Sequence, residues 1–219
     1  MTRPPILVAP SLLACDFGNL ESEVRAAEAA GGDWLHCDVM DGHFVDNISF
    51  GPAFVKAAAK VATVPLDVHL MVTRPDVYFP RFTEVAGNIS VHLEAEHDVK
   101  QTLRGIRAAG CGAGLAICPA TDFAGVLPYL EEIELLLIMT VVPGFGGQPF
   151  LREMMTKVRA AAETRERLGL GYRIEVDGGV TVETAKLAVE SGADTLVAGT
   201  SVFGASDWSE AVSRLRGDR

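Results

Sequence analysis

The sequence predicts a (β/α)₈ barrel, the TIM-barrel architecture, in a single domain that spans residues 1–219, and three observations lead to this expectation. A short apolar run with β-branched residues is followed by a helical stretch, and this pattern occurs eight times. Strict alternation is typical of a parallel sheet. Eight units in 219 residues, without a linker, indicate a closed barrel. An open doubly wound sheet is the alternative, but no glycine-rich dinucleotide fingerprint follows an early strand.

Strands are predicted where apolar, β-branched residues cluster, at 6–12, 34–40, 65–71, 89–94, 113–118, 135–142, 173–177 and 195–199. Helices are predicted between them, at 17–30, 52–61, 76–86, 98–109, 122–130, 150–168, 182–191 and 208–216. In the first helix, the apolar spacing and an N-cap at Asp16 support the prediction, with Phe17, Leu20, Val24 and Ala27 on one face. Left-handed C-caps are expected where a glycine follows a helix, at Gly31, Gly87, Gly110 and Gly192.

Polar side chains are expected inside the barrel, although such interiors are normally filled by branched apolar residues. Side chains alternate across a strand, and in four strands one whole face is apolar and suits the layer beneath the helices. The opposite faces carry His36, Asp38 and Met40; Asp67, His69 and Met71; Ser90, His92 and Glu94; and Glu175 and Asp177. Because unpaired buried charges are unfavourable, these groups must pair, bind a metal or line a wet cavity. A polar network without chemistry is the alternative.

Two imidazoles and two carboxylates of this set form a candidate metal site. His36 and Asp38 lie two residues apart on one face, and His69 and Asp177 are expected at matching depth on the third and seventh strands. Such donors suit Zn²⁺, Fe²⁺, Mn²⁺ or Co²⁺ better than Mg²⁺ or Ca²⁺. Asp67 is expected to orient a histidine rather than to bind the ion.

Other histidines and the glycines allow further expectations. His92 and Glu94 fit a supporting hydrogen-bonded layer at least as well as direct catalysis, whereas His43 and His97 are expected in loops or at the surface. Three glycine-rich turns end the last three strands, at 143–148, 177–179 and 198–201. Loops at this edge of such barrels commonly bind phosphate, because glycines let backbone N–H groups approach the ligand.

The reaction class is inferred from the residue types that could carry chemistry and from the lack of lysines on the predicted strands. No predicted strand carries a lysine, so Schiff-base chemistry has no nucleophile. Two carboxylates, a divalent metal and a phosphate site indicate proton abstraction beside a carbonyl, with the second carboxylate returning a proton to the opposite face. Inward methionines at Met40, Met71 and Met139 suit a cover over a planar intermediate, and adaptable core packing is their alternative role.

Composition limits the partners and the compartment. The net charge is −10 and no basic patch is present, which argues against nucleic-acid binding. No apolar run reaches 18 residues, and the apolar part of the N-terminus is too short for a signal peptide. The cysteines form no C-x-x-C pair and are expected as reduced thiols, at Cys15, Cys37, Cys111 and Cys118. We therefore expect a cytoplasmic protein without a membrane partner.

Several motifs closely resemble the ribulose-phosphate 3-epimerase family. They are VAPSLLACDF, LHCDVMDGHFVDNISFGP, PLDVHLMV, MTVVPGFGGQPF, IEVDGGV and VAGTSVF, and they extend from the first strand to the last. DVMDGHFV and PGFGGQ are specific signatures. The resemblance implies a ribulose-phosphate-binding barrel that interconverts D-ribulose 5-phosphate and D-xylulose 5-phosphate in the pentose phosphate pathway. It also implies a homo-oligomer.

The resemblance also implies roles for individual residues. One divalent metal ion would be bound by His36, Asp38, His69 and Asp177, and Asp38 and Asp177 would be the paired base and acid. The residues implied around the substrate are Ser11, His69, Met40, Met71, Met139, Gly144, Phe145, Gly146, Gly147, Gly178, Gly179, Gly199 and Thr200.

Three positions depart from the family pattern. Asp46 replaces a usual proline, Val142 replaces a polar residue that often precedes PGFGGQ, and Cys118 replaces a common asparagine. A sister family acts on D-allulose 6-phosphate, and the run HLMVTRP also resembles it, so a hexulose-phosphate epimerase is an alternative. A barrel lyase and a non-catalytic sugar-phosphate binding protein are more distant alternatives.

Overall fold

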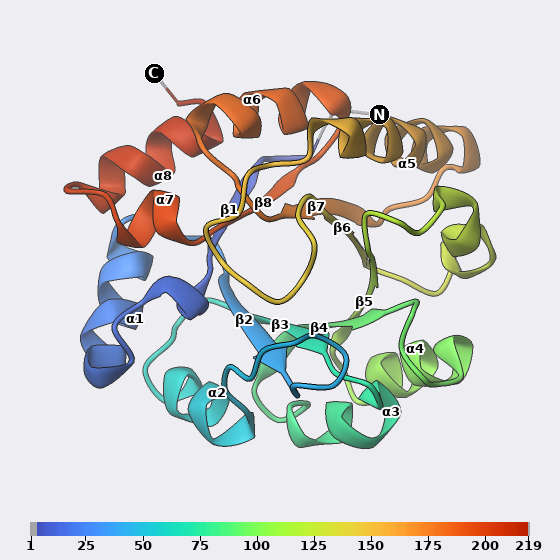
Figure 1. Cartoon of the computed structure of the whole chain (residues 1–219), viewed down its shortest axis with the longest axis horizontal. Coiled ribbons are helices and arrows are strands. Elements are labelled where there is room, and N and C mark those ends of the chain that lie inside the picture. Colours follow the sequence, from blue (N-terminus) through green and yellow to red (C-terminus); the bar gives the residue numbers. More distant parts are fainter. Residues whose placement is uncertain (1–3, 219) are drawn as a thin grey trace.

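The computed structural model describes residues 4–218, in which eight parallel strands form a ring surrounded by helices (Figure 1). The strands are β1 (Leu7–Pro10), β2 (Leu35–Met40), β3 (Leu66–Met71), β4 (Ala86–His92), β5 (Gly112–Ile117), β6 (Leu135–Met139), β7 (Arg173–Asp177) and β8 (Thr195–Ala198). From β2 to β8 each strand pairs with its sequence neighbour, and β8 pairs with β1. The predicted (β/α)₈ barrel is therefore confirmed.

The ring closes between β1 and β2 through a few contacts rather than a full ladder. Ser11 and His36 form an isolated parallel bridge. Asp33 adds two bonds, because its backbone N–H donates to the carbonyl of Val8 at 2.9 Å and its Oδ2 accepts from the Val8 N–H at 2.8 Å. These contacts bring the end of β1 beside the first polar residues of β2.

Apart from α7, for which no helix was predicted, the helices occupy the predicted places, with differences at several ends. The α-helices are α1 (Leu20–Ala29), α2 (Pro52–Ala59), α3 (Pro75–Tyr78), α4 (Val99–Ala108), α5 (Met155–Leu168), α6 (Val182–Ser191), α7 (Thr200–Phe203) and α8 (Trp208–Arg216). Short 3₁₀ helices cover Leu12–Ala14, Phe17–Asn19, Phe79–Arg81, Phe123–Tyr129 and Arg152–Met154. Asp16 is a cap as expected, but of the 3₁₀ turn that precedes α1.

Two helical predictions are wrong in extent or type. The predicted helix 76–86 ends as α-helix at Tyr78 and continues only as a 3₁₀ turn, because Pro80 cannot donate a helical hydrogen bond. The predicted helix 122–130 is a 3₁₀ helix that contains Pro128. The predicted strand 89–94 instead covers Ala86–His92, which leaves Glu94 beyond the strand.

The C-cap prediction is correct for three of the four glycines. Gly31, Gly110 and Gly192 have φ values of 98°, 86° and 117°. Gly87 is an exception, because it lies inside β4. A Cβ atom there would lie 2.7 Å from the Cβ of Pro65, so this glycine permits close approach of the chain just before β3.

Strand parity in β2 and β3 is as predicted and separates an outer apolar core from the polar barrel interior. The outward residues of β2 and β3 belong to the main core, as Cys37 and Val68 illustrate, each with no exposed surface. The inward residues His36, Asp67 and His69 are equally buried. The four cysteines form no disulfide; two are buried and two are half-buried.

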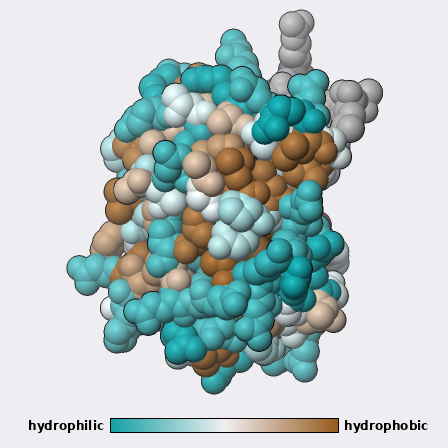
Figure 2. Space-filling model, turned by 90° about the vertical axis from the view of Figure 1, so that its right-hand side faces the viewer, coloured by the Kyte–Doolittle hydropathy of each residue, from teal (hydrophilic) through white to brown (hydrophobic). Residues whose placement is uncertain are grey.

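The outer surface carries many charged residues. Figure 2 shows mainly hydrophilic residues, with hydrophobic patches between them, on the side that bears Phe123–Tyr129. Exposed ion pairs such as Arg104–Glu132 (2.9 Å) and Arg107–Glu134 (3.0 Å) contribute little stability individually. Among the helices between residues 4 and 218, none combines the length and apolar character that a membrane span requires.

Asp194 is a buried carboxylate that joins α5, β7 and β8, and its removal is expected to destabilise the barrel. Its oxygens accept from Arg165 Nη1 at 2.5 Å, from the Ile174 N–H at 3.2 Å and from Arg173 Nη1 at 3.3 Å. Asp194→Ala removes these bonds, including the ion pairs with two arginines, so the free energy of unfolding should fall by about 2–4 kcal/mol. Urea unfolding measures this, with exposed Asp46→Ala as a control that should change stability by less than about 0.5 kcal/mol. An equal effect of both substitutions would contradict the assignment.

Candidate functional site

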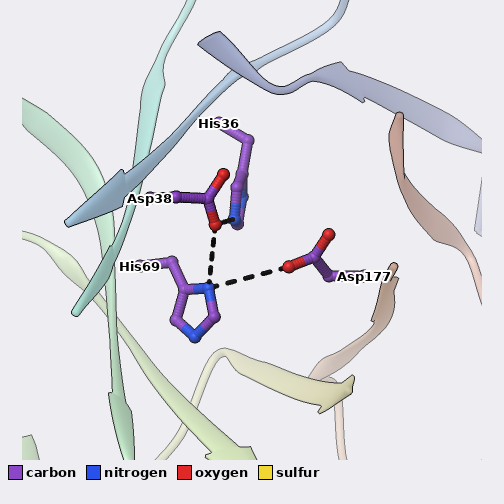
Figure 3. Close-up of side chains that lie close together, drawn as sticks. All are labelled: His36, Asp38, His69 and Asp177. Carbon is purple, nitrogen blue, oxygen red and sulfur yellow. Dashed lines mark hydrogen bonds and ion pairs between the residues drawn. The ribbon is translucent and has the colours of Figure 1, made fainter. Parts of the chain in front are cut away.

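Four predicted side chains meet in the barrel interior (Figure 3). Register explains the meeting, since Asp38 of β2 pairs directly with His69 of β3. Asp38 Oδ1 lies 3.2 Å from His36 Nε2 and 3.3 Å from His69 Nδ1, and Asp177 Oδ2 at the end of β7 lies 3.8 Å from the same His69 nitrogen. The possible ligand atoms of all four residues lie within 4.8 Å of one another.

The donor set has the chemistry of a divalent metal site. His36 is fully buried, and its Nε2 makes no hydrogen bond within the part of the chain that the structure describes. A buried, unsatisfied imidazole nitrogen facing a carboxylate is unfavourable unless a further group binds there. The other nitrogen, Nδ1, contacts Asp67 Oδ2 at 2.7 Å. Asp67 therefore occupies the orienting position expected of it.

The two carboxylates of the site have opposite pKa shifts. Burial alone would raise the pKa of Asp38, but the charge of His36 and contacts with both histidines hold it well below its usual value. Burial and the charge of Asp38 raise the pKa of Asp177 from 3.8 to about 7. Ser11 Oγ also donates to Asp38 Oδ2 at 2.6 Å. Asp38 is therefore ionised in the resting site, while Asp177 exchanges a proton near neutral pH.

Glu175 is a buried carboxyl group to which sequence reasoning assigned no role. It lies two residues before Asp177, and its Oε1 is 4.0 Å from His36 Nδ1. Burial and the charge of Asp67 raise the pKa of Glu175 well above its usual value. The alternation of β7 indicated that this side chain points inward, but only the structure shows that it lies beside His36 and Asp67, where its raised pKa favours the protonated form.

A line of hydrogen bonds continues behind His69. Its Nε2 lies 2.8 Å from His92 Nε2, and His92 Nδ1 lies 3.1 Å from Glu94 Oε2. Glu94 does not face the interior as predicted, because β4 ends at His92; it is partly exposed and reaches back to the imidazole. His97 lies in the adjoining loop with its Nε2 3.0 Å from the His92 carbonyl, and His43 is an exposed loop residue.

The carboxylates Asp38 and Asp177 open into a cavity of about 540 Å³. The cavity is lined by nearly all the residues implied around the substrate, namely Ser11, Met40, Met71, Met139, Gly144, Phe145, Gly146, Gly147, Gly178, Gly179, Gly199 and Thr200. His69, also implied as a substrate contact, does not line it, because its ring is fully buried among Asp38, Asp177 and His92.

The loop that follows β6 extends over the centre of the ring of strands (Figure 1). Asn47 holds it from the β2 side, donating from Nδ2 to the Gly144 carbonyl at 2.7 Å. Gln148 Nε2 donates to the carbonyls of Val142 and Phe145 at 2.7 and 2.8 Å. Asn47 was missed because its partner is 97 residues away.

Some residues that line the cavity were not predicted. Two of the residues that depart from the family pattern do not line it. Arg152 and Thr181 line the cavity, although no sequence signal singled them out. Asp46 and Val142 are exposed and are not among the lining residues. The departures at these two positions therefore leave the cavity wall unchanged.

Acid should weaken the bonds made by Glu94. Burial would raise its pKa, but bonds from His92, Thr121 and the Cys118 N–H lower it from 4.5 to about 2. A lowered folded-state pKa contributes stability above about pH 4.5, and this contribution is lost as the pH falls toward 2. Glu94→Gln should cost about 1–2 kcal/mol at pH 7, allowing for partial exposure. The difference from wild type should narrow between pH 4.5 and 2.5 in urea unfolding; a constant difference would contradict this account.

Comparison with known proteins agrees with the geometry. The model of the ribulose-phosphate 3 epimerase family matches residues 7–203. A ribulose-phosphate 3-epimerase of Bacillus subtilis is 44% identical over 216 residues, which cover 98% of this chain and 100% of the relative. A chloroplastic ribulose-5-phosphate-3-epimerase of Arabidopsis thaliana is 40% identical, covering 100% of this chain and 79% of the relative.

Solved structures show the same fold at low sequence identity. KGPDC from Streptococcus mutans in complex with D-R5P has a TM-score of 0.72 at 14% identity, covering 97% of this chain and 96% of its own. A 3-hexulose-6-phosphate synthase has a TM-score of 0.64 at 18% identity, covering 98% and 99%. From the family match and the two relatives together, the chain belongs to the ribulose-phosphate 3-epimerase family.

Proposed function

We propose that this protein interconverts D-ribulose 5-phosphate and D-xylulose 5-phosphate by epimerisation at carbon 3. The observation that carries the proposal is the pair Asp38 and Asp177, whose pKa values are shifted in opposite directions at the base of one cavity. Their carboxylates approach His69 from different directions (Figure 3). The relatives are named as epimerases of this substrate class.

The proton transfers follow from these two groups. In one direction Asp38 takes the proton from carbon 3, and the electron pair of the broken C–H bond delocalises onto the neighbouring carbonyl as an enediolate. Asp177 then gives its proton to the other face of the same carbon, which inverts the stereocentre. In the reverse direction the roles exchange. A group with a pKa near 7 suits this task, because it gains and loses protons readily at neutral pH.

A divalent ion fits the donor set of His36, Asp38, His69 and Asp177. The unsatisfied Nε2 of His36 supports this, and two imidazoles with two carboxylates suit Zn²⁺, Fe²⁺, Mn²⁺ or Co²⁺. When bound, such an ion supplies positive charge that stabilises the negative charge developing on the substrate oxygens. Met40, Met71 and Met139 line the cavity and would shield the planar intermediate from water.

The phosphate group would be held mainly by backbone N–H groups. Among the described residues that line the cavity, Arg152 is the only lysine or arginine, and it is paired with Glu183 at 2.5 Å. Gly178 and Gly179 have φ values of 112° and 65°, a backbone region that suits glycine and turns the chain toward the cavity. A homo-oligomeric state and a cytoplasmic location stay predictions made from the sequence.

Asp177→Asn should abolish epimerisation while the fold is retained. The amide cannot exchange a proton with carbon 3, so kcat should fall by about 10²–10⁴-fold or more. Turnover of D-ribulose 5-phosphate in ²H₂O measures this, because wild-type protein should incorporate deuterium at carbon 3. Activity like that of wild type in the variant would contradict the two-carboxylate mechanism. Faster wild-type turnover of D-allulose 6-phosphate would reassign the substrate, and deuterium incorporation from neither substrate would favour simple binding.

Gly179→Ala should weaken substrate binding without touching the carboxylates. An added Cβ would lie 2.6 Å from the backbone nitrogen of Phe150, so the loop after β6 must move. We expect KM for D-ribulose 5-phosphate to rise about tenfold, equivalent to about 1.4 kcal/mol. Gly51→Ala is the control, since nothing lies within 4 Å of its added Cβ. Unchanged KM in Gly179→Ala would show that this turn does not bind substrate.

A further inference from the structure

A hydrogen-bonded chain runs from the proposed metal ligand His69 to the edge of the barrel. His69 Nδ1 faces Asp38 and Asp177, and its Nε2 lies 2.8 Å from His92 Nε2. His92 is fully buried, and its Nδ1 lies 3.1 Å from Glu94 Oε2. Three side chains in series therefore connect a possible ligand nitrogen with a carboxylate outside the interior.

The direction of these bonds is determined at Glu94. Glu94 Oε1 accepts from the Cys118 N–H at 2.8 Å and from the Thr121 hydroxyl, so the side chain acts as an acceptor. An ionised carboxylate has no proton to give, and His92 Nδ1 must therefore carry the proton that lies between them. In a neutral imidazole the other nitrogen is then the acceptor. His92 Nε2 consequently accepts from an N–H at His69 Nε2.

When the proton of His69 is on Nε2, the Nδ1 nitrogen has a free lone pair. Asp38 Oδ1, at 3.3 Å, would by itself favour a proton on this nitrogen. The two carboxylates at the ends of the imidazole pair thus compete for the position of one proton. Glu94 favours the tautomer in which Nδ1 can act as a ligand, and Asp38 favours the other.

The loop that carries the anchors of Glu94 is itself held firmly. Lys157 of α5 donates from Nζ to the carbonyls of Cys118, Pro119 and Thr121 at 3.2, 2.7 and 2.5 Å. No role was predicted for Lys157, because it does not lie on a predicted strand. In the structure it fixes the loop after β5. Glu94 is thus bonded to β4 and to the loop after β5, and α5 in turn holds that loop, as expected of a supporting arrangement rather than a mobile surface residue.

We propose that Glu94 and His92 are positioning residues that hold His69 in its metal-binding tautomer and so raise the affinity of the site for a divalent ion. This inference rests on the metal site of the proposed function. Residues that orient a ligating histidine through its second nitrogen commonly change metal affinity by about 10–100-fold. Here the effect reaches the ligand through an additional imidazole.

Glu94→Gln tests the inference because the amide can reverse the chain. If its oxygen keeps the bonds from Cys118 and Thr121, its NH₂ group faces His92 Nδ1, which must then accept. His92 Nε2 then carries the proton, and His69 is driven to the tautomer protonated at Nδ1. Glu96→Gln is the matched control, because it makes the same chemical change on an exposed side chain two residues away.

Zinc affinity is the first measurement, by competition with a chromophoric chelator at pH 7. We expect the dissociation constant to rise about 10–100-fold in Glu94→Gln and by less than about twofold in Glu96→Gln. The second measurement is the NMR resonance of the His69 Nε2 proton in zinc-saturated protein, which should move upfield in Glu94→Gln as its acceptor is lost. Neither readout depends on turnover.

Thr121→Val supplies an independent variant of similar shape in case Glu94→Gln folds poorly. It removes one of the bonds that orient Glu94, so zinc affinity should fall in the same direction and by less. If zinc binds both variants within twofold of wild type and the His69 proton resonance stays in place, the inference is wrong. If wild-type protein itself binds no zinc or cobalt, the metal site of the proposed function is wrong instead.

Discussion

The rest of the site depends on the burial of several ionisable groups inside a barrel whose interior offers little water. His36, Asp67, His69, His92 and Glu175 have no exposed surface. Each must be compensated by a neighbour, by a proton or by a bound ion, since an isolated buried charge costs several kcal/mol. The described arrangement uses the first two means, and the proposed ion would supply the third. Imidazoles contact carboxylates, the raised pKa of Glu175 favours its protonated form, and the unsatisfied Nε2 of His36 faces the position proposed for a metal.

This compensation also separates the two working carboxylates. Asp38 is surrounded by both histidines and the Ser11 hydroxyl, which stabilise its charge. Asp177 lies farther from His69, at 3.8 Å, and experiences the charge of Asp38. Two chemically identical groups thereby acquire different proton affinities within one cavity. The same low-polarity surroundings that make burial costly therefore suit the pair for acid–base chemistry.

The cavity has a different character at its other end. The phosphate side of the proposed site is built from glycine turns after β6, β7 and β8, and Arg152, the only lysine or arginine among the described lining residues, is already paired. Backbone N–H groups hold an anion without adding a titratable group beside Asp177. The proposed metal and acid–base chemistry would thus be concentrated on β2, β3 and β7, while anion binding would be left to loops. The cross-barrel contact of Asn47 with Gly144 joins the two regions.

Most of what the sequence by itself determined came from the alternation of side-chain direction along the strands. Alternation in β2, β3 and β7 was enough to point His36, Asp38, His69 and Asp177 inward, because the direction of a side chain in a strand depends only on its position. The resemblance to known motifs then supplied the substrate-facing residues. Helix limits were less certain, because Pro80 and Pro128 changed the type of helix rather than its place.

Only the tertiary structure decided how these groups act on one another. The raised pKa values of Asp177 and Glu175 and the line from His69 to Glu94 depend on distances between strands and loops remote in sequence. Glu94 shows most clearly where prediction from strand alternation fails. Its parity predicted an inward side chain, yet β4 ends two residues earlier and the chain turns. Alternation applies only while backbone pairing continues, so beyond that point packing determines where a side chain lies.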